Sequence, residues 1–145
     1  MFTIGVFQDV EWADRGIGAL VEDGFDKASV SVIAKQTEQA EALVSSRFSE
    51  PAARMDVKRL GSVVARGPLV AVLQGSDAAL EANGLASVCG RAGFQAHDGH
   101  IFETLVGRGG VLVAVHNLPR AADALAKLHA YGGGNAAIGA WVGRV

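Results

Sequence analysis

Two histidines, an aspartate and a glutamate lie within eight positions of the segment AHDGHIFETLVGRGG, residues 96–110. Imidazole and carboxylate groups are the side chains that most often bind metals or transfer protons at neutral pH. His97, His100 and Glu103, with His116 at the end of the apolar run that follows, are therefore the candidate metal or acid/base residues.

The spacing of these residues argues against a shared site. Gly99 interrupts the segment, and Asp98 is a better N-cap than interior residue, so we expect a helix to begin after His97. In that helix Ile101, Phe102, Leu105 and Val106 form the apolar stripe, which places His100 and Glu103 on the opposite face as a solvated pair. The sequence therefore predicts no metal site, although His116 leaves open a sensor that binds a metal or small molecule.

Other catalytic patterns are also missing. The glycines do not lie between a strand and a following helix, where a phosphate loop needs them. Ser62 and Ser76 follow glycines but lie outside any G-x-S-x-G motif, and Cys89 sits in an apolar segment typical of a buried thiol. We predict no catalytic residue and no cofactor.

Composition restricts the class of protein further. The 145 residues are 50% hydrophobic and 19% charged, which is typical of one compact domain spanning residues 1–145. A net charge of −2 gives no positive field for nucleic acid, and the segment RGGVLVAV lacks the aromatic side chains of an RNA-binding motif. Nucleic-acid binding is therefore not expected.

The sequence also predicts a cytoplasmic protein. Its single cysteine is compatible with a reducing compartment, and the start MFTIGVFQDVEW has no basic region typical of a signal peptide. Arg66 and Pro68 interrupt the longest apolar stretch, so we expect no insertion into a membrane.

The two ends of the chain repeat one module. Residues 1–35 and 111–145 each read as a strand, a capped amphipathic helix and a second strand, and Gly5 aligns with Val113 without gaps. The expected caps are Asp9 and Asn117, and the second strands are expected at 28–34 and 135–142, with 28–34 in the same sheet as the two first strands. Two such β-α-β units predict an α+β fold, a ferredoxin-like plait with an antiparallel sheet. The strands expected near 3–8 and 111–116 should be adjacent.

Residues 36–110 are expected to form a mainly helical insertion between the two units. Thr37 and Ser76 are suitable N-caps, and Val57, Leu60 and Val64 have the spacing of one helical face. The run LVAVL at 69–73 fits either a helix or a strand.

The expected central strand indicates self-association. Val111, Val113 and Val115 alternate with Leu112 and Ala114, so both faces of this strand should be buried. The two end helices can cover only one face. Leu112 and Ala114 should therefore meet either the inserted helices or a second subunit, and a homo-oligomer, most often a dimer, is expected.

Four segments together resemble the general-stress, heat-induced family of small bacterial proteins: GVFQDVEWADRGIGALVEDGF, SVSVIA, GPLVAVL and HIFETLVGRGGVLVAVH. The resemblance covers most of the chain and supplies no catalytic residue. The sequence departs from the family pattern in its middle. Many relatives carry an uncharged hairpin rich in Gly and Ala there, whereas this chain carries charged residues such as Arg54, Lys58 and Asp77.

These observations predict a non-enzymatic, self-associating protein with an accessory or scaffold role in a stress response. The stress role is what the family resemblance implies, whereas self-association is inferred from the central strand. The alternative is a small-molecule or metal-binding sensor that uses the sheet face near His100, Glu103 and His116.

Overall fold

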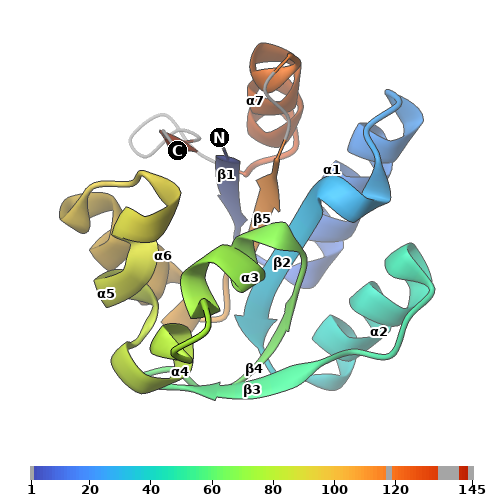
Figure 1. Cartoon of the computed structure of the whole chain (residues 1–145). Helices are drawn as coiled ribbons and strands as arrows, with labels where there is room; N and C mark the ends of the chain where they lie inside the picture. The colour runs from blue at the N-terminus through green and yellow to red at the C-terminus, as the bar shows by residue number, and fades with distance from the viewer. Residues whose placement is uncertain (1, 117–118, 134–140, 144–145) are drawn as a thin grey trace.

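The computed structural model describes residues 2–116, 119–133 and 141–143, which form a mixed α+β fold with one open antiparallel sheet (Figure 1). The strands are β1 (Phe2–Phe7), β2 (Val30–Lys35), β3 (Arg54–Val57), β4 (Gly61–Arg66), β5 (Val111–Val115) and β6 (Trp141–Gly143). The α-helices are α1 (Val10–Glu22), α2 (Glu38–Phe48), α3 (Pro68–Gln74), α4 (Ala79–Asn83), α5 (Leu85–Val88), α6 (Ala96–Gly107) and α7 (Ala121–Ala130). Short 3₁₀ turns occupy Lys27–Ser29 and Cys89–Ala92.

The strands lie in the order β3-β4-β2-β5-β1-β6. Strand β1 pairs antiparallel with β5, with Gly5 opposite Val113, and β5 pairs antiparallel with β2, with Val32 opposite Val113. The prediction that three separate segments share one sheet, with the first and third adjacent, is confirmed. The expected last strand at 135–142 falls mostly outside the described residues, which include β6 at 141–143.

Two predicted helix starts, those of α1 and α2, are confirmed by a capping side chain. Asp9 accepts a hydrogen bond of 2.9 Å from the Trp12 backbone N–H at the start of α1. Thr37 accepts one of 3.0 Å from Ala40 N–H at the start of α2. Each bond satisfies an N–H group that the helix itself leaves free. Asn117, the cap expected in the second module, lies outside the described residues.

Helices cover both faces of the sheet, and β5 contributes to the core on each side. Val111, Val113 and Val115 pack into one core with apolar side chains of α1, α2 and α7. Leu112 and Ala114 pack into the other core with side chains of α3, α4, α5 and α6. The alternation predicted for this strand is confirmed.

The interface role expected for Leu112 and Ala114 is wrong. Both side chains are 0% exposed under helices of the same chain, so no surface remains there for a second subunit. A charge at either position would lie in the core and would unfold the chain instead of separating subunits. If this protein self-associates, it uses another surface.

Residues 54–66 form a β-hairpin instead of the expected helix. The spacing of Val57, Leu60 and Val64 suggested a helical face, but Val63 and Val64 are both buried because helices cover both sides of β4. The turn between the strands places Arg59 at φ 71° and Gly61 at φ 78°, a conformation that ends a helix.

Two other ambiguities in residues 36–110 are resolved. The run at 69–73 belongs to a helix, α3, which Pro68 begins. The N-cap predicted at Ser76 is wrong, because α4 begins only at Ala79, after Ala78 in the left-handed region. In the part of the chain that is described, no helix is both long and apolar enough to cross a membrane.

The chain passes from β4 into α3 through a tight crossing at Gly67. Gly67 has φ +100°, and a Cβ atom added there would lie 2.5 Å from the Cα atom of Ser31. The buried Ser31 hydroxyl accepts a hydrogen bond of 2.9 Å from Leu69 N–H in the first turn of α3. Close backbone contact and one buried hydrogen bond therefore fix where α3 begins.

The Gly67→Ala substitution should lower the free energy of unfolding by about 3 kcal/mol or more, because it adds a backbone clash to an unfavourable φ. Gly61→Ala is the matched control, since Gly61 also has positive φ but open space around its missing Cβ. The control should cost only about 1 kcal/mol. Urea unfolding of both variants measures the difference, and equal losses would contradict the close contact at Gly67.

Candidate functional site

The predicted histidines lie on α6, which begins at Ala96 instead of after His97. Asp98 lies in the first turn of this helix and does not cap it. His97 and His100 are exposed and line a shallow hollow of about 360 Å³, together with Ile101, Thr104, Leu105 and Arg108. All of these side chains come from α6 or from Arg108 directly after it, so no facing element in this lining brings an acid, base or nucleophile to them.

Glu103 is not the solvated partner of His100 that the sequence suggested. Its carboxylate accepts two hydrogen bonds, of 3.1 and 3.2 Å, from Nε of Arg59. The same guanidinium donates to the Asn83 carbonyl at 3.0 Å, and the Glu103 side chain is only 15% exposed. Glu103 therefore connects α6 to the β3–β4 turn and to the end of α4.

His116 has a separate partner as well. Its ring stacks on the ring of Phe2 with centroids 4.7 Å apart, and its backbone N–H donates to the Ser29 carbonyl at 2.9 Å. Among the residues described, no group of three or more His, Cys, Asp or Glu side chains is placed to hold a metal ion. The sensor set of His100, Glu103 and His116 is thus divided among separate contacts.

Cys89 is a buried thiol. Its side chain belongs to the core under α3 to α6, with 2% of the residue exposed. Burial raises the pKa of the thiol from its ordinary value of 9.0 to about 12, with a smaller contribution from the negative charges of Glu103 and Asp98. Because the thiolate is the nucleophilic form, Cys89 is unsuited to catalysis.

The interior of the protein contains little polar chemistry. Thr3 and Ser31 are the buried polar residues among those described, and every buried side-chain nitrogen or oxygen in that set has a hydrogen-bond partner. A catalytic or ligand-binding cavity usually contains several convergent polar groups. The described core has no such group, so attention moves to the surface.

One surface feature is aromatic. Trp12 on α1 is 38% exposed, the highest value for a large hydrophobic residue in the described part of the chain. Two shallow hollows of about 370 and 290 Å³ meet at His129 on α7; one is lined by Trp12 and Tyr131, and the other by Ala122, Leu125 and Ala126. This α1–α7 surface offers contact area but no carboxylate, serine or cysteine in its described lining.

The second surface feature is the edge of the sheet at β3. Strand β3 ends the strand order and runs along the lower side of the molecule between α2 and α4 (Figure 1). Arg54 and Asp56 are exposed, whereas Met55 is half-buried against one core and Val57 is fully buried. Apolar side chains therefore hold one face of β3, and the other face carries two opposite charges.

The hydrogen-bond pattern of the hairpin shows which backbone groups are free at this edge. Ala65 N–H donates to the Ala53 carbonyl at 3.0 Å, and Met55 lies opposite Val63. Because bonded and non-bonded pairs alternate in an antiparallel ladder, Ala53 and Met55 direct their backbone groups toward β4. Arg54 and Asp56 direct theirs outward, and no described residue bonds to those outward groups.

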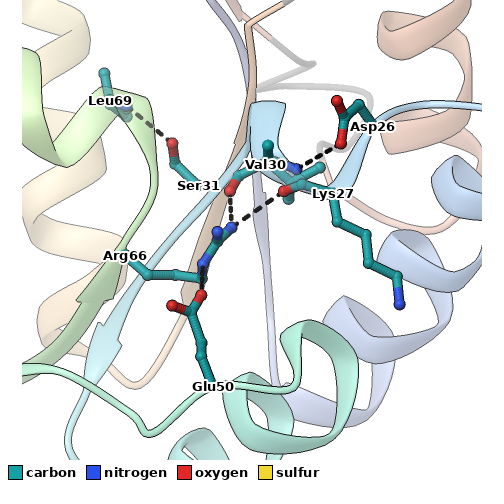
Figure 2. Close-up of polar contacts among 8 residues, drawn as sticks. Asp26, Lys27, Val30, Ser31, Glu50, Arg66 and Leu69 are labelled. Atoms are coloured by element: carbon teal, nitrogen blue, oxygen red, sulfur yellow. Dashed lines mark hydrogen bonds and ion pairs between the residues drawn. The ribbon is translucent and has the colours of Figure 1, made fainter.

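A network around Arg66 holds the edge strand in place (Figure 2). Nε of Arg66 donates to Glu50 at 2.5 Å, in the segment just before β3. Its Nη1 donates to the carbonyl oxygens of Val30 and Lys27 at the start of β2, and the guanidinium lies over the ring of Phe48 at 3.9 Å. The Arg66 side chain is only 15% exposed.

Replacing Arg66 by Met should lower the free energy of unfolding by about 2 kcal/mol, because two backbone carbonyls and Glu50 lose a charged donor. The control is Arg91→Met, which removes an exposed pair with Asp77 and should change stability by less than about 0.5 kcal/mol. Thermal and urea unfolding measure both. Equal effects would show that the Arg66 network contributes no more than a surface ion pair.

Cys89 should react at least about a hundredfold more slowly with an aromatic disulfide reagent at pH 8 in the folded protein than in urea. Its raised pKa also means that the unfolded chain loses the thiol proton first, so the stability of the wild type should fall as the pH rises from about 9 toward 12. Cys89→Ala should remove that part of the pH dependence. Rapid labelling of the folded protein would contradict the buried position.

The open edge at β3 is not among the candidates that the sequence offered, which were His97, His100, Glu103 and His116 for a metal and Leu112 and Ala114 for an interface. The signal for the edge was present as Arg54-Met55-Asp56-Val57, in which charged and apolar residues alternate with period two.

Comparison with family models, curated proteins and solved structures found no match to this chain.

Proposed function

We propose that this chain is a non-enzymatic, self-associating accessory protein of the cytoplasm, similar in role to the general-stress, heat-induced proteins that its sequence resembles. The proposal is supported by what the described surface contains. The hollows on α6 and beside α7 bring together no set of facing acid, base and nucleophile, whereas the sheet ends in a strand with outward backbone groups that no described residue bonds.

The proposal includes a ferredoxin-like plait as the underlying fold. The order β6-β1-β5-β2, with α1 following β1 and α7 following β5, supports two β-α-β units side by side. To these the chain adds the β3–β4 hairpin beside β2 and the helices α3 to α6 over the second face. The hairpin moves the open edge of the sheet from β2 to β3.

The open β3 edge is the observation that carries the proposal. An edge strand presents unpaired N–H and C=O groups, which makes it a site where another strand can add. Proteins that remain monomeric commonly shield such edges with helices, bulges, prolines, charged side chains or a short strand. Strand β3 has four residues, two of them charged, so strand addition here requires that those charges be paired. Here Pro51 precedes β3, and Lys58 N–H just after it bonds to Glu81 of α4, so the stretch between them is left open.

The purified wild-type chain should therefore associate reversibly. We expect sedimentation velocity and light scattering to give twice the mass of the chain at tens of micromolar, with dissociation on dilution. High salt should weaken the association, because the open edge carries exposed charges. A chain that stays monomeric over this whole concentration range would overturn the proposed function.

A further inference from the structure

We propose that two copies of this chain pair through β3, antiparallel about a two-fold axis at Met55, so that Arg54 of each copy lies opposite the partner's Asp56. This proposal rests on the self-association proposed above and identifies its surface and register. Two observations support it. The backbone groups along β3 point alternately toward β4 and outward, and two exposed residues on one face of β3, Arg54 and Asp56, carry opposite charges.

The backbone limits the possible registers. The outward N–H and C=O groups belong to Arg54 and Asp56, so these residues must lie in the hydrogen-bonded pairs of any antiparallel β3–β3 ladder. Within β3 the two-fold axis can therefore lie at Arg54, Met55, Asp56 or Val57. An axis at Val57 forms fewer ladder bonds, because Asp56 would lie opposite the partner's Lys58, whose N–H already bonds to Glu81, and Arg54 opposite a residue of the partner's turn. An axis between two neighbouring residues would place outward groups opposite inward ones and would lose these bonds.

Charge then selects one of these registers. An axis at Arg54 places two arginines directly opposite each other, and an axis at Asp56 places two aspartates opposite each other, which destabilises a cross-strand pair. An axis at Met55 places Arg54 opposite the partner's Asp56 and, by symmetry, Asp56 opposite the partner's Arg54. Both pairs then combine opposite charges with backbone hydrogen bonds.

The side chains around the axis are compatible with this register. Met55 would meet the partner's Met55 on the apolar face, where it already packs against the core of α3 to α6. Ala53 would lie opposite the partner's Val57, and its small side chain leaves room for the turn that follows β3. Arg54 also pairs with Glu41 within the chain, and its guanidinium has enough donors for a second carboxylate.

Such a pairing closes on itself. Each chain contributes one β3 edge, so the two sheets join into one continuous sheet and no β3 edge remains for a third copy. The α1–α7 surface around Trp12 takes no part and stays free for a different partner. Strand addition at β3 thus predicts a dimer and not an open-ended fibre.

Charge reversal followed by mixing tests the register. Asp56→Arg places arginine opposite arginine in both pairs, and Arg54→Asp places aspartate opposite aspartate. Each variant alone should dimerise at least about tenfold more weakly than the wild type. An equimolar mixture of the two should form a heterodimer near wild-type affinity, and the swap Arg54→Asp with Asp56→Arg in one chain should restore the homodimer.

The matched control is Asp123→Arg, which makes the same change of charge at an exposed position of α7. It should leave the dimer unchanged, as should Trp12→Ala. Circular dichroism and melting temperature of each variant show whether it folds. Two results would overturn the β3 register while the proposed self-association stands. One is a wild-type dimer that Trp12→Ala dissociates. The other is an equimolar mixture of the Asp56→Arg and Arg54→Asp chains that forms no heterodimer.

Hydrogen exchange on the wild type gives a readout that needs no variant. The outward amides of Arg54 and Asp56 should exchange rapidly in dilute protein and at least about tenfold more slowly at concentrations where the dimer forms. The inward amide of Met55 should be slow at both concentrations, because β4 already bonds it. Fast exchange at Arg54 and Asp56 in the concentrated dimer would overturn the proposal.

Discussion

The burial of β5 on both faces is the constraint on which the rest of the fold depends. Every residue from Val111 to Val115 is at most 1% exposed, so each face of the sheet needs its own layer of helices. The helices of the two end modules supply only one layer. The long segment between them therefore has to supply the other, and its helices α3 to α6 do so.

Covering the second face changes what the protein can use for recognition. A sheet with one bare face would bind through that face, but here the face is core and lacks unpartnered polar atoms among the described residues. The features that stay exposed include the β3 edge, with its outward backbone groups, and the α1–α7 surface around Trp12.

Arginine side chains connect the elements at that periphery. Arg66 ties the segment before β3 to the start of β2, and Arg59 ties the β3–β4 turn to α4 and α6. Each forms hydrogen bonds to backbone carbonyls as well as to a carboxylate, which is stronger than an isolated surface ion pair. The position of the β3 edge is thus set by charged contacts at both ends of the hairpin.

The amino-acid sequence alone is enough to predict the local elements whose signals are short-range. The Asp9 and Thr37 caps and the alternation along β5 could be predicted because caps and periodicity depend on neighbouring residues. The pairing of β1 with β5 could be predicted because the two ends of the chain repeat one module. The partners of Leu112 and Ala114, the hairpin at 54–66 and the separation of Glu103 from His100 became visible only in the folded chain. All three depend on packing between residues far apart in the sequence. Val63 and Val64 lie in a strand because both of their side chains are buried, one on each face of the sheet. Arg59, 44 residues before Glu103, forms the hydrogen bonds to the carboxylate that local spacing had assigned to His100.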